Sequence, residues 1–182
     1  MQIARDHGIK KALKTVKDKK NTEHLTGYSA AGIVIALGAN INDLAIGDRV
    51  ACAGAQYAHH AEYISVARNL CVLIPEKLDF EAASTITLGA IALQGVRRSQ
   101  PTLGETFVVI GLGILGQLTA QILRTNGCRV IGIDTDYSRI DKAISLGMAH
   151  GFHPDDIDID TVARTTDGFG ADSVIITAAS VS

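Results

Sequence analysis

The sequence predicts an α/β protein in which a strand-rich N-terminal part precedes a doubly wound parallel sheet. Between residues 28 and 75, short apolar runs are separated by glycine turns, a pattern that indicates a small β-barrel-like module. From Thr106 onward strand-like and helix-like segments alternate, which indicates parallel strands joined by right-handed crossovers. The change of pattern places a boundary near residue 90.

The N-terminal part is expected to begin with a basic helix, because residues 3–17 carry spaced apolar side chains among lysines. Short strands are expected after it, the last of them stopped by Pro75, and two helices follow. The expected strands are residues 32–37, 48–51, 61–66 and 71–74, and the expected helices are residues 80–88 and 90–98.

In the C-terminal part, strands are expected at residues 107–110, 129–133, 150–152 and 173–177, and helices at residues 115–125, 138–146 and 160–165. The aspartate-rich tract from Pro154 to Asp160 lacks the glycine and the terminal glutamate of a calcium loop. We interpret it as a polar loop that leads into a helix.

A G-x-G-x-x-G motif connects the first of these strands to its helix. Gly111 allows a tight turn, Gly113 lets the backbone approach a pyrophosphate, and Gly116 lets the helix pack closely on the sheet. The start of the helix also offers free N–H groups and the positive end of its dipole to phosphates. The motif in this context predicts a dinucleotide site, whereas a plain strand-turn-helix that binds nothing is the alternative.

Asp134 ends the next strand, 18 residues after Gly116, where a carboxylate can accept hydrogen bonds from ribose hydroxyls. An acid at this position favours NAD, because the 2′-phosphate of NADP would meet like charge and no Arg or Lys follows directly. Methyltransferases also combine a glycine-rich turn with a strand-end acid, so a nucleoside-binding methyltransferase stays open as an alternative.

Composition excludes several other classes. The net charge of −2 gives no indication of nucleic-acid binding. No apolar run reaches membrane-spanning length, so no membrane association is expected. The three cysteines are widely separated and no secretory segment precedes them, which favours reduced thiols and a cytoplasmic location.

Many ordered segments resemble the medium-chain dehydrogenase/reductase superfamily of alcohol dehydrogenase-like proteins. They are G27-Y-S-A-A-G32, G47-D-R-V50, A61-E-Y63, I74-P75, E81-A-A83, G111-L-G-I-L-G116, I131-G-I-D134, L146-G147, D167-G-F-G-A-D172 and V174-I-I-T-A178. The resemblance implies a partial GroES-like substrate domain at residues 1–90, with a basic helix at 1–20, and a partial NAD-binding Rossmann domain at residues 91–182.

Within this family frame, the implied cofactor site has several parts. The backbone from Gly111 through Ile114 and Leu115 to Gly116 would hold the pyrophosphate. Asp134 would hold the adenosine ribose, and Arg139 matches a family position near that ribose. Thr177 and Ala178 end a strand and would lie beside the cofactor.

Departures from the zinc-dependent members predict a zinc-free protein with no metal site. Tyr28 stands where those members have a histidine ligand, and tyrosine is a rare zinc ligand. No cysteine lies near Thr87, the place of a second ligand, and the four-cysteine structural zinc lobe is absent. Adjacent His59 and His60 would point to opposite faces of a strand. Tyr28 is therefore the one catalytic candidate, as a hydrogen-bond donor to a substrate oxygen or simply as a packed side chain.

The basic helix followed by GYSAAG looks closest to the medium-chain half of two-part (bi-domain) oxidoreductases. A Rossmann sheet has six strands, whereas about four are expected here, so we interpret the chain as a fragment. The expected function is NAD(H)-dependent, zinc-independent hydride transfer at a carbonyl or hydroxyl carbon of a small molecule, with homo-oligomers formed by the full-length parent. The alternatives are a non-catalytic dinucleotide-binding remnant and an interaction module.

Overall fold

The computed structural model describes residues 26–179, so the expected basic helix lies outside the described residues. In chain order the elements are β1 (Ser29–Ile33), β2 (Arg49–Ala53), η1 (Arg68–Leu70), β3 (Cys71–Leu73), α3 (Phe80–Ala83), α4 (Ile86–Ser99), β4 (Thr106–Ile110), α5 (Ile114–Thr125), β5 (Arg129–Ile133), α6 (Tyr137–Ser145), β6 (His150–Phe152), η2 (Pro154–Asp156), α7 (Ile159–Thr165) and β7 (Ser173–Ile176). They form a mixed α/β structure with one antiparallel and one parallel sheet.

The N-terminal sheet is antiparallel, with the strand order β1-β2-β3. The strand expected at residues 32–37 lies earlier, because β1 pairs with β2 from Ser29 only as far as Ile33. The apolar side chains of Ile35 and Leu37 beyond that point are exposed.

The strand expected at residues 61–66 is wrong. No strand is assigned there, although Ile64 and Val66 pack against a small cluster of buried residues made of Val50, Cys52, Ala58 and Cys71. Alternate side chains thus reach the core from an unpaired segment. This gives the sequence the period of a strand without the hydrogen-bonded neighbour that a strand requires.

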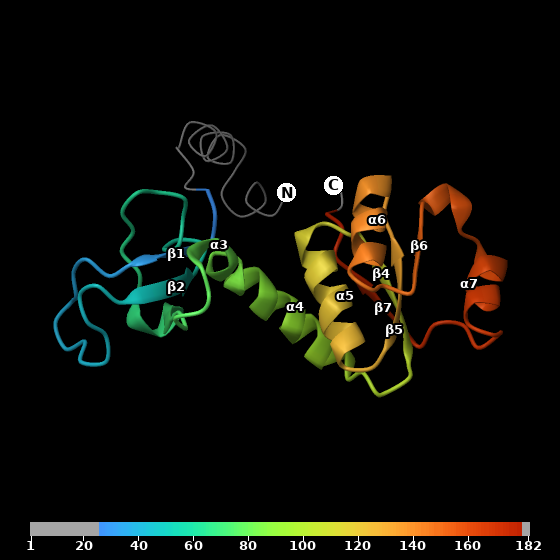
Figure 1. Cartoon of the computed structure of the whole chain (residues 1–182), viewed down its shortest axis with the longest axis horizontal. Coiled ribbons are helices and arrows are strands. Elements are labelled where there is room, and N and C mark those ends of the chain that lie inside the picture. Colours follow the sequence, from blue (N-terminus) through green and yellow to red (C-terminus); the bar gives the residue numbers. More distant parts are fainter. Residues whose placement is uncertain (1–25, 180–182) are drawn as a thin grey trace, which may run out of the picture.

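A long helix connects the two sheets. The two helices expected at residues 80–98 are divided differently, because α3 ends at Ala83 and α4 runs unbroken from Ile86 to Ser99. In Figure 1, α4 (green) crosses from the N-terminal sheet to the helix α5, and it contacts β1 and β2 of that sheet as well as α5. It ends at Gln100 in the left-handed conformation, followed by Pro101, which cannot continue a helix. The boundary expected near residue 90 falls inside α4, and the division into domains stays a prediction.

The C-terminal sheet is parallel, with the order β6-β5-β4-β7. Its strands and helices match the predicted ones to within one residue at each end. The aspartate-rich tract is the predicted loop, in which Asp158 accepts a hydrogen bond from the Thr161 N–H and so caps α7. The chain builds β4, β5 and β6 in one direction and then returns to place β7 on the other side of β4. The carboxyl ends of β4 and β7 therefore form a topological switch point, where ligands bind in such sheets.

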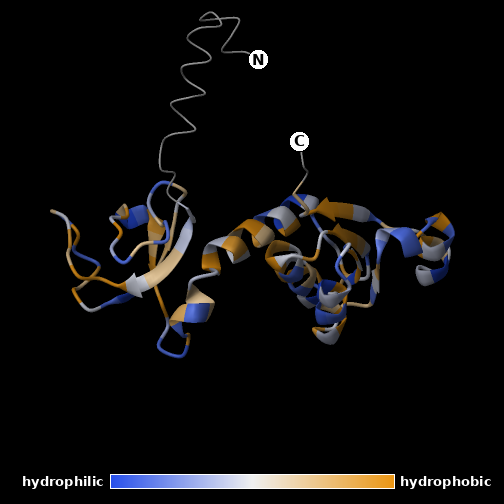
Figure 2. Cartoon of the chain, turned by 90° about the horizontal axis from the view of Figure 1, so that it is seen from above, coloured by the Kyte–Doolittle hydropathy of each residue, from blue (hydrophilic) through white to orange (hydrophobic). Residues whose placement is uncertain are grey.

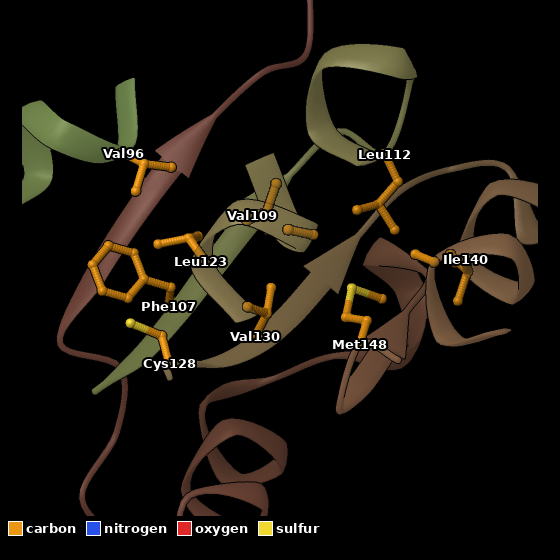
Figure 3. Packing of buried hydrophobic residues seen from close by; sticks show 11 residues of the cluster. Val96, Phe107, Val109, Leu112, Leu123, Cys128, Val130, Ile140 and Met148 are labelled. Carbon is orange, nitrogen blue, oxygen red and sulfur yellow. The ribbon is translucent and has the colours of Figure 1, made fainter. Parts of the chain in front are cut away.

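The main core lies between this sheet and the helices α4, α5 and α6 (Figure 3). Phe107 and Val109 from β4, Leu123 from α5 and Val130 from β5 are almost completely buried. On the opposite face of the sheet Val108 and Ile131 are buried as well, as expected for parallel strands covered on both sides.

The described edge strand, β7, is less covered. Val174 and Ile176 are exposed, whereas Ile175 packs against the core. Figure 2 shows hydrophobic residues (orange) on strands of the parallel sheet and along α4. None of the helices described combines the length and apolar character needed to cross a membrane.

The core assignment predicts the effect of removing Phe107. Its side chain has no exposed surface, so we expect Phe107→Ala to lower the free energy of unfolding by about 3–5 kcal/mol. Phe169, which is 93% exposed, is the matched control, and Phe169→Ala is expected to change stability by less than about 0.5 kcal/mol. Urea denaturation measures both. Equal effects of the two substitutions would contradict the described core.

Candidate functional site

The turn between β4 and α5 lies at the switch point, and its first glycine meets two requirements. Gly111 has a φ of +92°, in the left-handed region that favours glycine. A Cβ on Gly111 would also come within 2.6 Å of the Ala178 backbone nitrogen. The turn thus needs Gly111 both for its direction and for the close approach of the chain that follows β7.

Gly116 allows α5 to begin directly against the turn. A Cβ there would collide with the Gly111 carbonyl oxygen and lie 2.9 Å from the Thr177 hydroxyl oxygen. The Thr177 hydroxyl itself donates to the Gly111 carbonyl at 2.5 Å. The prediction that Gly116 allows close packing of the helix is therefore confirmed.

Gly113 differs from the other two glycines, because its outer side is open. It is the N-cap of α5, with φ −64° and ψ −172°, an ordinary extended conformation. A Cβ added at Gly113 would meet no atom within 4 Å. The first N–H groups of a helix lack partners within the helix, and the first turn of α5 has no acidic residue. The turn therefore presents unhindered backbone N–H groups, with ordinary geometry, to an anion.

The Asp134 side chain accepts a hydrogen bond from the backbone of the glycine turn. Its carboxylate is buried, with 7% of the residue exposed, and it accepts hydrogen bonds from the Leu112 N–H at 2.5 Å and the Asp136 N–H at 2.8 Å. The Arg139 guanidinium lies 3.7 Å from Asp134 and 3.4 Å from Asp136. The carboxylate thus joins the end of β5 to the glycine turn, a structural role that the sequence did not predict. A carboxylate has about four lone-pair positions, so capacity remains for ribose hydroxyls.

Asp136, Ser138 and Arg139 lie near Asp134, at the start of α6. Half of the Arg139 side chain is exposed. Hydrogen bonds from the Ser138 hydroxyl and backbone N–H hold the pKa of Asp136 below its usual value, so it stays charged at neutral pH. Two carboxylates therefore face one guanidinium at the carboxyl end of β5.

Gln117 is a residue of this site that sequence reasoning missed. Its side-chain amide donates to the Leu112 carbonyl at 3.2 Å and to the Arg139 carbonyl at 2.8 Å. It thus connects α5 to the turn and to α6. In the sequence, only its position in the first helical turn after the glycine motif pointed to Gln117. That position does not indicate which distant residues the side chain contacts.

Thr177 and Ala178 lie beside the turn. Their N–H groups donate to the Ile110 carbonyl, at 2.8 Å and 3.1 Å, so the chain after β7 crosses the end of β4. Both residues therefore lie at the start of the glycine turn. Their contact with a cofactor stays a prediction, as do the cofactor contacts of Ile114, Leu115 and Arg139.

Tyr28 lies in the other part of the chain, directly before β1. It is 42% exposed, and its hydroxyl makes no hydrogen bond within residues 26–179. The Thr87 hydroxyl, at the start of α4, donates weakly to the Cys52 carbonyl at 3.4 Å. The structure thus brings neither side chain into hydrogen-bonding contact with the glycine turn, and the role of Tyr28 stays a prediction.

The described residues do not supply a donor set for zinc. Across residues 26–179, no group of three or more His, Cys, Asp or Glu side chains is arranged to hold a metal ion. His59 is partly buried and its Nδ1 has no partner among the described atoms, whereas His60 is exposed. The two neighbouring histidines thus differ in their surroundings, as expected for adjacent residues.

Comparison with known proteins shows which proteins this architecture resembles. The family model described as zinc-binding dehydrogenase matches residues 115–182. A sorbitol dehydrogenase of Halalkalibacterium halodurans is 25% identical, and the match covers 82% of this chain and 52% of that protein. The structure of an alcohol dehydrogenase superfamily protein from Novosphingobium aromaticivorans is 27% identical, with a TM-score of 0.75 over 86% of this chain and 49% of that one.

These similarities support the assignment of the chain to the medium-chain dehydrogenase/reductase superfamily. A quinone oxidoreductase from Coxiella burnetii is also similar, at 25% identity and a TM-score of 0.71, covering 95% of this chain and 54% of that one. The chain spans about half the length of these superfamily members. The antiparallel sheet and the parallel sheet agree with the two-part α/β fold expected from the sequence.

The glycine geometry predicts that two similar substitutions differ in stability. Gly116→Ala forces a Cβ onto the Gly111 carbonyl, so we expect it to lower the free energy of unfolding by about 1–3 kcal/mol. Gly113→Ala adds a Cβ in open space at ordinary φ, so no loss is expected. Urea denaturation of both variants tests this. Equal destabilisation would show that the turn is not shaped as described.

Proposed function

We propose that this chain binds NAD(H) and belongs to a zinc-independent oxidoreductase of the alcohol dehydrogenase-like type. The reaction is hydride transfer at a carbonyl or hydroxyl carbon of a small molecule. The observation that carries the proposal is the glycine turn at the switch point of the parallel sheet, formed and held by Asp134, with its open side at Gly113. The dehydrogenases and the quinone oxidoreductase among the relatives support the reaction class.

The residues of the turn fit a dinucleotide. The N–H groups at the start of α5, from Gly113 to Leu115, would bind the pyrophosphate. Asp134 would accept hydrogen bonds from the adenosine ribose, and Thr177 with Ala178 would border the cofactor at the carboxyl end of β7. A bound nicotinamide ring supplies the acceptor or donor of the hydride, and this chain's residues supply position.

Charge favours NAD over NADP. A 2′-phosphate next to Asp134 would meet the carboxylates of Asp134 and Asp136 and a single guanidinium, that of Arg139. Because Arg139 already faces both acids, it gives little net attraction for an added phosphate. A free 2′-hydroxyl instead can donate to a carboxylate.

Zinc independence rests on the donor chemistry described above. Tyr28 stands where zinc-dependent members have a histidine ligand, and a phenol is a poor zinc ligand. Near Thr87, where those members have a cysteine ligand, this chain has no cysteine. Tyr28 would instead donate a hydrogen bond to the substrate oxygen, which is a role that geometry must establish before acidity is considered.

A second candidate is a dinucleotide-binding chain without catalysis. It is favoured by one observation: among the described residues, no hydrogen bond joins the Tyr28 side chain to the residues of the glycine turn. This candidate predicts NADH binding without turnover of aldehydes, ketones, quinones or nucleotide-linked sugars, including in the longest chain that can be produced. This candidate would be excluded if the chain turned over one of these substrates and the Tyr28→Phe substitution reduced that turnover without weakening NADH binding.

The cofactor proposal predicts the result of calorimetric titration. We expect NADH to bind at least about tenfold more tightly than NADPH, a difference of about 1.4 kcal/mol. Gly113→Ala should weaken NADH binding by at least about tenfold without loss of stability, because its methyl group occupies the space that the phosphates need.

Gly38→Ala is the matched control for this titration. Gly38 lies in an exposed loop of the N-terminal part, and an added Cβ there also meets no atom within 4 Å. It should bind NADH as the unchanged chain does. Unchanged NADH binding by Gly113→Ala would contradict the proposed phosphate site, and tighter binding of NADPH would contradict the role of Asp134.

A further inference from the structure

Two buried cysteines face each other in the N-terminal sheet. Cys52 on β2 and Cys71 on β3 are directly opposite residues, and their sulfur atoms lie 3.6 Å apart. Both are free thiols with less than a tenth of their surface exposed. Neither cysteine belongs to the glycine turn, so the pair is independent of the proposed cofactor site.

The hydrogen-bond register brings the two backbones close at this pair. The Ile74 N–H donates to the Arg49 carbonyl, so residues 49 and 74 form a hydrogen-bonded pair of the antiparallel ladder. Pairs alternate along such a ladder, which makes Cys52 and Cys71, three positions further along, a non-hydrogen-bonded pair. In such pairs the Cα atoms are about 4.5 Å apart, which is within the range found for disulfides.

The surroundings select the kind of oxidant. The sulfurs lie in an apolar cluster with Val50 and Ala58, which excludes large or charged reagents. Burial, together with the neighbouring Cys71 thiol, raises the pKa of Cys52 to about 12, so little of it is thiolate at neutral pH. A small uncharged oxidant acting slowly therefore fits this site, whereas glutathione disulfide does not.

We propose that Cys52 and Cys71 are a modification site at which a peroxide forms a reversible cross-strand disulfide. The thiolate of one cysteine attacks a peroxide oxygen, the O–O bond breaks, and a sulfenic acid and hydroxide are formed. The second thiolate then attacks the sulfenic sulfur and displaces hydroxide. In total two thiols and one hydrogen peroxide give one disulfide and two waters, and the two electrons from sulfur reduce the peroxide.

The disulfide would close the chain between β2 and β3. β3 has only three residues, and the connection back to β2 contains no other regular element than η1. Closing this connection covalently would hold the short strand on the sheet when its ladder opens.

Tryptic mapping of the full chain tests this proposal. Cleavage after Arg49, Arg68 and Lys77 places Cys52 in the peptide 50–68 and Cys71 in the peptide 69–77. Cys128, which is buried in the other core and lies near no other cysteine, falls in a third peptide. The chain is treated with hydrogen peroxide, quenched with catalase, alkylated at remaining thiols, digested without reductant and examined by mass spectrometry.

We expect the linked pair of peptides 50–68 and 69–77, with alkylatable Cys52 and Cys71 lost in equal amounts and Cys128 retained. The linked pair should form equally in Cys128→Ser, the matched control, and should disappear on treatment with dithiothreitol. Retention of both thiols after prolonged peroxide treatment would overturn the proposal. So would separate over-oxidation of Cys52 and Cys71 without the linked peptides, or cross-linking that involves Cys128.

Discussion

The hydrogen bond from the Leu112 N–H to the buried carboxylate of Asp134 connects the two parts of the site that must act together. A carboxylate removed from water is costly unless its oxygens are satisfied. Here the N–H groups of Leu112 and Asp136 satisfy them, and Arg139 lies near. The same bond fixes the first peptide of the turn after Gly111. The turn is thus held in shape by the protein itself, and a ligand would not have to order it, which lowers the cost of binding.

The order of the strands explains why this turn lies where a ligand can reach it. The chain leaves β4 toward one side and later returns to place β7 on the other side of β4, so the turn after β4 lies at a topological switch point. Gly111 and Gly116 are closed against Ala178 and Thr177, whereas Gly113 is open. The three glycines of one motif therefore have different roles. Gly111 and Gly116 permit close packing of the protein, whereas Gly113 leaves space beside the turn for a ligand. A substitution can separate stability from binding for this reason.

Much of the fold could be predicted from the sequence, because the signals concerned are local. Glycines at 111 and 116 are required by φ and by contact within one strand-turn-helix unit, and the alternation of strands and helices after Thr106 fixes a parallel sheet. The errors arose where periodicity does not determine pairing. Ile64 and Val66 alternate like a strand but have no partner strand, and α4 continues through Gly89 although a break was expected there. The bond between Leu112 and Asp134 and the bridge made by Gln117 join residues 22 positions apart, and only the assembled sheet brings these partners together.

We infer that the turn is formed before its ligand binds. NMR of a ¹⁵N-labelled chain tests this inference directly, by recording the amide chemical shifts and exchange rates without and with NADH. We expect the Leu112 amide resonance to be strongly downfield and slow to exchange in the absence of NADH, since this amide donates to a buried carboxylate. We also expect NADH to shift the amide resonances of Gly113, Ile114 and Leu115 most, while the Leu112 amide keeps its protection from exchange. Rapid exchange of Leu112 without NADH, or unchanged resonances at Gly113 to Leu115 at saturating NADH, would show that the turn is not formed and used as proposed.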